Sequence, residues 1–144
     1  MGYTHYWERP PHLPAQAFGR AVADCQRVLP ETNVPLAGSD GTGPPDFRAD
    51  AIIFNGVGTA MYETFDMRLE EEASRDGNRL VFSFCKTEHR PYDLDIQVAL
   101  IVFKHYLRRQ LRVTSDGDEA DWDAARRFCQ EHLGYGGDFH LDHG

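Results

Sequence analysis

The sequence has little of what would assign a protein to a class at once. Its 144 residues include only three cysteines, Cys25, Cys85 and Cys129, which is too few for a disulfide framework and typical of a reducing compartment. The longest apolar run, Val98 to Phe103, is far shorter than the ~18 residues that a membrane helix needs. The first residues lack the charged and apolar regions of a signal peptide. The sequence therefore predicts a cytoplasmic protein with no membrane partner.

Basic residues are also scarce. Fifteen Lys and Arg stand against 23 Asp and Glu, so the formal net charge is −8. Because a phosphate backbone is bound by clustered Lys and Arg, this balance disfavours nucleic acid as a partner. The seven histidines form no HExxH pair or comparable spacing. We therefore expect no metal site and no other cofactor, and we read His140 and His143 as part of a frayed tail over about 138–144.

The hydrophobic pattern predicts an α+β fold. The length is typical of one domain spanning residues 1–144. Apolar residues recur at helical spacing in three segments, and six segments read as strands. We expect a single mixed or mainly antiparallel sheet of about six strands with about three helices packed on it. The helices are expected at 15–29, 92–110 and 121–133, and the strands at 2–8, 34–37, 49–55, 60–67, 79–86 and 111–114.

The segment 79–86 is apolar on both faces, which favours a central strand. The helix over 92–110 is apolar enough to lie against it. We therefore predict that Phe84 is buried together with Val98 and Ile101. The charged stretch 70–78 between strands reads as a solvated loop.

The junction after this strand carries the ingredients of an anion site. A strand leads into a helix N-terminus within about six residues, and such a junction gathers backbone N–H groups. Lys86 and Arg90 add charge, Thr87 adds a hydroxyl, Tyr92 adds a ring and an O–H donor, and Asp93 begins the helix. The alternative is that both cations only neutralise neighbouring carboxylates.

Two other segments could complete such a site. The opening strand carries His5 and Trp7, and an aromatic ring beside a charge suits a nucleobase with its phosphate. Asn55 and Glu63 lie on adjacent predicted strands and offer an amide and a carboxylate. If strands 2–8 and 79–86 pair, these groups form one composite pocket. Ordinary core packing is the alternative for Trp7.

Catalysis has weaker support. Cys85 with His89 is the candidate nucleophilic pair, but neither lies in a recognisable nucleophile context. The acidic pair Asp116 and Asp118 suits a turn without any function. An enzyme acting on a nucleotide or phosphorylated substrate therefore stays the alternative hypothesis. In it, acid, base and electrostatic roles are shared by Lys86, Asp93, Glu63 and His5.

Several motifs resemble a family of small uncharacterised proteins encoded in bacteriophage and bacterial genomes. They are the opening Gly2-Tyr3-Thr4-His5-Tyr6-Trp7, then Phe54-Asn55-Gly56, Glu63-Thr64-Phe65, Phe84-Cys85-Lys86-Thr87 and Pro91-Tyr92-Asp93. The resemblance spans most of the chain and implies a phage-related role in the host cytosol. It carries no catalytic residues over.

These observations lead to one favoured hypothesis and two alternatives. The favoured one is a phage-type binder of a small anionic or nucleotide-like ligand, which captures a signalling molecule without chemistry. The alternatives are the enzyme described above and an acidic protein–protein interaction module. A homo-oligomer stays open.

Overall fold

The computed structural model describes residues 2–73 and 79–143. Within them the chain forms seven strands and three α-helices, which confirms the α+β class. The predicted loop 70–78 lies partly outside the described residues. The helices are α1 (Ala15–Val28), α2 (Asp93–Leu107) and α3 (Asp123–Leu133). The strands are β1 (Thr4–Arg9), β2 (Leu36–Ala37), β3 (Asp46–Arg48), β4 (Ala51–Gly56), β5 (Phe65–Arg68), β6 (Val81–Lys86) and β7 (Arg112–Ser115).

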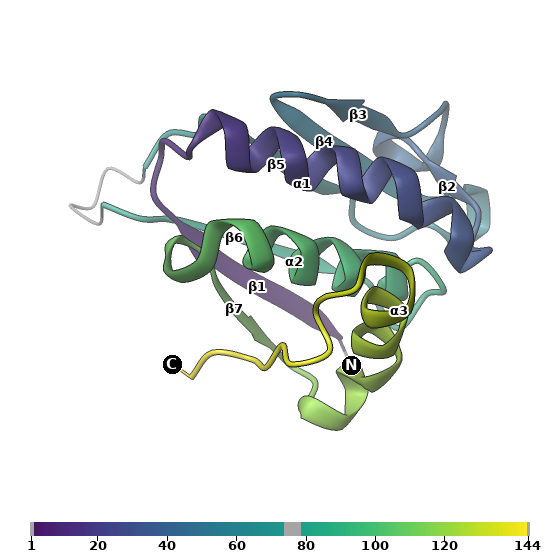
Figure 1. The fold of residues 1–144 in the computed structure, drawn as a ribbon. Coiled ribbons are helices and arrows are strands. Elements are labelled where there is room, and N and C mark those ends of the chain that lie inside the picture. The colour runs from purple at the N-terminus through teal and green to yellow at the C-terminus, as the bar shows by residue number, and fades with distance from the viewer. Residues whose placement is uncertain (1, 74–78, 144) are drawn as a thin grey trace.

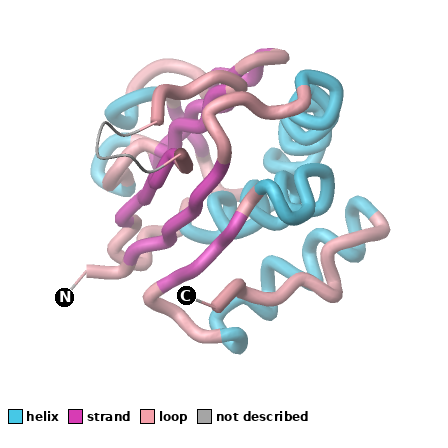
Figure 2. The backbone as a smooth tube through the Cα atoms, turned by 90° about the vertical axis from the view of Figure 1, so that its left-hand side faces the viewer, coloured by secondary structure: helices cyan, strands magenta, loops and turns pink. Residues whose placement is uncertain are grey.

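The strands form two antiparallel sheets instead of the one expected. In the described chain, the first has the order β6-β1-β7, and the second places β4 at the centre of β2, β3 and β5. The helices lie on one side of the strands (Figures 1 and 2). Helix α2 covers the first sheet, α1 lies over the second sheet and contacts β3, and α3 packs on α2.

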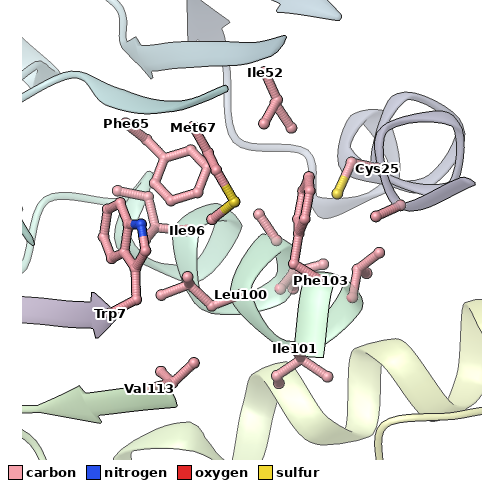
Figure 3. Close-up of a cluster of buried hydrophobic side chains, with 14 of the residues drawn as sticks. Trp7, Cys25, Ile52, Phe65, Met67, Ile96, Leu100, Ile101, Phe103 and Val113 are labelled. Carbon is pink, nitrogen blue, oxygen red and sulfur yellow. The ribbon is translucent and has the colours of Figure 1, made fainter. Parts of the chain in front are cut away.

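Helix α2 is the centre of the core because it is enclosed on nearly every side. All nine residues from Asp95 to Phe103 are buried. The amphipathic α1 contributes a stripe at spacings of three and four residues, from Phe18 to Val28. Between the layers, Trp7 of β1 lies against Phe65 of β5, with ring centroids 5.2 Å apart (Figure 3). The two sheets therefore share one hydrophobic core.

A buried arginine joins the two sheets. The Arg9 side chain has no exposed surface and donates to the carbonyls of Pro10, Pro11, Arg68 and Leu69. Its guanidinium also lies 3.1 Å from the Glu71 carboxylate. Burial lowers the pKa of Arg9, and the charge of Glu71 opposes that shift. All these partners lie just after β1 or at the end of β5, so Arg9 links the end of the first sheet to the second.

Several expectations about individual segments are wrong. The strand expected over 60–67 begins only at Phe65, because residues 58–60 form a 3₁₀ turn, and the expected series lacked β3. Segment 79–86 is an edge strand, since β1 holds the centre. Phe84 is 54% exposed and not part of the core, although Val98 and Ile101 are buried as expected. In β6, Val81 and Cys85 are buried while Phe82 and Phe84 point outward.

The tail is also packed instead of frayed. Phe139 and Leu141 are buried, and the Asp142 carboxylate lies 3.0 Å from Lys104 Nζ. Asp142 N donates to Val113 O, and Val113 N donates to the Asp142 carboxylate, both at 2.8 Å. This segment therefore lies beside β7 (Figure 1).

Candidate functional site

The structure brings together most of the residues that the sequence singled out. Strand β1 pairs with β6, which sets Thr4 opposite Lys86 and His5 opposite Cys85. The pairing of the first strand with segment 79–86, which the composite pocket required, is therefore present. The start of α2 follows directly, so His5, Lys86, Thr87 and Asp93 meet at one end of the first sheet.

A hydrogen-bonded chain runs through this end of the sheet. His5 Nε2 lies 2.7 Å from Asp93 Oδ1, and His5 Nδ1 lies 2.8 Å from Ser115 Oγ. Thr87 Oγ1 donates to the same Asp93 oxygen at 2.5 Å, and Gln97 donates to the other at 3.1 Å. Since the carboxylate accepts from Nε2, the neutral ring accepts at Nδ1 from the Ser115 hydroxyl.

This connectivity is that of a Ser–His–Asp group, but its surroundings favour a structural role. Catalysis by such a group needs free N–H donors beside the serine to stabilise an oxyanion. The backbone N–H of Asp116 donates to Thr4 O, and that of Gly117 donates to Ser115 Oγ. The imidazole of His5 is fully buried. The chain of bonds therefore cross-links β1, β7 and α2.

The turn between β6 and α2 is unusual. Arg90 N donates to Thr87 O at 2.9 Å, and both central residues, Glu88 and His89, have positive φ, at 52° and 59°. Such a type I′ turn normally carries Asn and Gly, because a Cβ disfavours this conformation. The His89 ring stacks on Tyr3, with centroids 3.7 Å apart, which stabilises the strained turn. His89 is therefore held by Tyr3.

The predicted cations lie at the surface near this turn. Among the described residues, neither Lys86 nor Arg90 has a carboxylate within salt-bridge distance. The Arg90 guanidinium lies 5.9 Å from the ring centroid of Tyr62. Lys86 N donates to the Glu63 carboxylate at 2.7 Å, so a negative charge stands beside the lysine.

The remaining predicted residues have structural bonds. The Tyr92 hydroxyl donates to the carbonyl of Glu63 at 2.5 Å, and burial raises the pKa of Tyr92 far above its ordinary value. The Asn55 side chain accepts from the backbone N–H of Gly56 and Tyr62 and thereby holds the loop between them. Asn55 and Glu63 therefore shape the chain and do not converge on an open pocket.

Two chemical roles do not fit the structure. Trp7 is 2% exposed and packs on Phe65, so its ring is not available to stack on a ligand (Figure 3). Cys85 is buried, and burial raises the pKa of its thiol to about 12, the reverse of what a nucleophile requires. The ring of His89 stacks on Tyr3 and is not paired with this thiol.

A cavity lies at the C-terminal end of α2, away from the junction of β6 and α2. This groove, the α2–α3 groove, has a volume of about 620 Å³, within the usual range for small-molecule sites. Its polar lining comes from three segments: the end of α2, the end of α3, and the loop that follows α3. The lining includes Lys104, His105, Arg108, Gln130, Tyr135, Asp138 and His140.

Aromatic rings give the groove a rigid wall. Tyr135 stacks on His105, with centroids 3.7 Å apart and planes at 10°. The Tyr135 hydroxyl donates to Asp24 of α1 at 2.7 Å, which fixes the ring. Gly136 lets the loop approach closely, because a Cβ there would lie 2.8 Å from both Ile101 and Cys129, and its φ is 95°. The wall is therefore built by the packing of α1, α2 and α3.

The two cations of the groove differ in their interaction partners. Lys104 is paired with Asp142, and it also donates to Leu111 O. Arg108 is exposed and, among the described residues, has no carboxylate within salt-bridge distance. Burial and the charge of Arg108 lower the pKa of His105. The guanidinium of Arg108 is therefore the group available to an anion.

The sequence contained a signal for this groove that we interpreted otherwise. Lys104 lies in the last turn of α2, where a cation also offsets the helix dipole, and Arg108 follows directly after that helix. His140 was assigned to a frayed tail. The groove forms only because the tail folds back on α2, and spacing along the chain does not show that.

Neither metals nor known proteins give further direction. Within the described residues, no group of three or more His, Cys, Asp or Glu side chains is arranged to hold a metal ion. In the same part of the chain, no helix has the length and apolar character to cross a membrane. Comparisons with protein-family models, curated proteins and solved structures find no match to this chain. The geometry of the chain is therefore the basis for assigning a function.

Proposed function

We propose that this protein binds a small anionic ligand in the α2–α3 groove. One observation carries the proposal: a cavity of about 620 Å³ places an uncommitted guanidinium, that of Arg108, beside a fixed pair of stacked rings, Tyr135 and His105. A guanidinium binds phosphate or carboxylate through two parallel hydrogen bonds. A rigid ring edge or face suits a planar group.

The ligand class follows from this pairing. A molecule with both a planar ring and a phosphate would use both features, and a nucleotide has both. The amide of Gln130 and the imidazole of His140 add polar groups that can orient such a ligand. The junction of Lys86 and Asp93 is less suitable, because Asp93 already accepts from His5, Thr87 and Gln97.

The biological setting of the proposal comes from the sequence. The resemblance to phage-encoded proteins supports a protein that captures a nucleotide-like signal in the cytoplasm of a bacterial host. The three free cysteines, all buried, suit a reducing compartment.

The proposal is tested by titrating the protein with AMP and with adenosine, using calorimetry. Arg108→Ala should weaken AMP binding at least about tenfold, because a charge-assisted hydrogen bond contributes about 1.5–3 kcal/mol. Adenosine, which lacks the phosphate, should bind the variant and the native protein alike. Arg109→Ala is the matched control, because Arg109 is exposed and does not line the groove.

Two outcomes would contradict the proposal. AMP binding that is equal in the Arg108 and Arg109 variants would show that the groove is not the site. AMP that is recovered chemically altered after incubation and heat denaturation of the protein would favour the enzyme hypothesis over capture.

A further inference from the structure

The outer face of the first sheet is not covered by any described helix. All three helices lie on its other side (Figures 1 and 2). In β6, Phe82 and Phe84 are 56% and 54% exposed, although phenylalanine is normally buried. Tyr6 of β1 faces the same side, and its ring centroid lies 6.0 Å from that of Phe82. We call this surface the aromatic face.

The register of the strands defines the composition of the aromatic face. Tyr6 pairs with Phe84 on one side and with Thr114 on the other, at the centre of the sheet. Lys86 pairs with Thr4 at one end. Glu8 pairs with Phe82 and with Arg112 at the opposite end. Rings therefore occupy the centre and one side, while charges stand toward the two ends.

The charges on the aromatic face balance, unlike those of the whole chain. Lys86 and Arg112 are cations, and Glu8 is an anion. Asp116 adds a second carboxylate at the Lys86 end, where it accepts from the Tyr6 hydroxyl at 3.0 Å. The face is thus neutral on a chain of net charge −8. These four charges therefore give no net repulsion between two copies of the chain that approach through this face.

We propose that the aromatic face binds a second copy of this chain. A symmetric dimer uses the same patch on both copies, so the patch must complement itself. Turning one copy about an axis across the strands sets Phe84 against Phe84 of the other copy and Arg112 against Asp116. Phe84 and Tyr6 then meet their own copies, Phe82 lies against Lys86, and Arg112 meets a carboxylate of opposite charge. A nucleic-acid strand fits less well, because two cations are offset by two carboxylates.

The size of the face predicts how stable the dimer is. Three strands about 4.8 Å apart and six residues at about 3.3 Å each give a face of roughly 14 Å by 20 Å, or about 300 Å². Stable interfaces bury about 800 Å² of surface on each partner. The dimer should therefore be weak and should dissociate on dilution.

Sedimentation velocity of the full chain tests this proposal. Between about 5 and 500 µM, the native protein should shift from monomer to dimer. The double variant Phe82→Glu with Phe84→Glu places two charges at the centre of the face and should raise the dimer dissociation constant at least about 100-fold. Ala23→Glu is the matched control, because it adds a charge to the exposed side of α1. It should leave the dimer unchanged.

A second measurement needs no variant. Amide NMR shifts of the native protein should change with dilution in β1, β6 and β7, and not in the exposed side of α1. Circular dichroism melts show whether the double variant is folded, and Phe84→Ser alone replaces it if it is not. A native protein that is monomeric at about 500 µM would overturn the proposal. A dimer that survives Phe84→Ser or the double variant, or dilution shifts confined to the helices, would also overturn it.

Discussion

Asp95 is expected to make the stability of the protein depend on pH. Its side chain lies in the first turn of α2 with no exposed surface. One carboxylate oxygen accepts from Thr32 Oγ1 at 2.8 Å, and the other has no hydrogen-bond partner among the described residues. Burial raises the pKa of Asp95 to about 7, although the bonds from Thr32 and from its own backbone oppose this.

The direction and the size of this pH dependence follow from proton binding by Asp95. A carboxyl whose pKa is higher in the folded state binds more protons folded than unfolded, so stability falls as pH rises from about 4 to about 7. The pKa of about 7 in the folded protein exceeds the ordinary aspartate pKa of 3.8 by about three. Each pKa unit corresponds to about 1.4 kcal/mol, so the full loss is about 4 kcal/mol. About 2 to 3 kcal/mol of it falls between pH 5 and pH 8.

Asp95→Asn isolates this effect. The amide keeps the shape of the side chain and cannot ionise in this range. Urea unfolding of both proteins should show the variant gaining about 2 to 3 kcal/mol relative to the native protein between pH 5 and pH 8. Asp50→Asn, at an exposed residue, serves as the control and should follow the native curve.

Parallel curves of unfolding free energy against pH for the native protein and Asp95→Asn would refute the raised pKa of Asp95. If native protein and Asp95→Asn lose or gain stability together from pH 5 to pH 8, the carboxyl ionises normally in the folded state. Burial would then not dominate its environment.

Two other predictions concern packing and the link between the sheets. Trp7→Ala should cost about 3–5 kcal/mol of unfolding free energy, because Trp7 is buried. Phe84→Ala should cost under about 1 kcal/mol, because Phe84 is exposed. Equal losses of stability in thermal melts of the two variants would contradict the faces assigned to these residues. Arg9→Lys should cost about 2–4 kcal/mol of unfolding free energy in urea, since one ammonium cannot replace the bonds to Pro10, Pro11, Arg68 and Leu69. Arg48→Lys, at an exposed arginine, is the control. An equal loss in the two variants would show that Arg9 does not join the sheets.

The sequence predicted which segments form helices and strands better than it predicted which of these segments lie side by side. Helical spacing from Phe18 to Val28 was sufficient to place α1, because one face of a helix is read locally. The run Val81-Phe82-Ser83-Phe84-Cys85 gave no polar signal to separate two faces. Which face turns inward is set by the pairing with β1, where Tyr6 meets Phe84. That pairing joins residues far apart in the chain, so local pattern could not supply it.

The candidate site was likewise predictable only in part, because much of it depends on contacts between distant residues. The sequence left open whether the first strand lies beside the Lys86–Asp93 junction, and the structure shows that His5 bonds to Asp93 there. The saturation of Asp93 by His5, Thr87 and Gln97 was not predictable, because it depends on side-chain distances. The α2–α3 groove depends on a folded-back tail, whose Gly and Asp content resembles a disordered end.

The position of Asp142 beside β7 limits how the protein can assemble. Its backbone and its carboxylate occupy both the donor and the acceptor of Val113, which closes that margin of the first sheet to another strand. On the other margin, the backbone of β6 is bonded to Glu63 only at Lys86 among the described residues. A sheet that can be extended from both margins can grow into a fibre, and one that can be extended from a single margin cannot. The tail therefore blocks strand addition at the β7 margin of this sheet, so another strand can be added to it only beside β6.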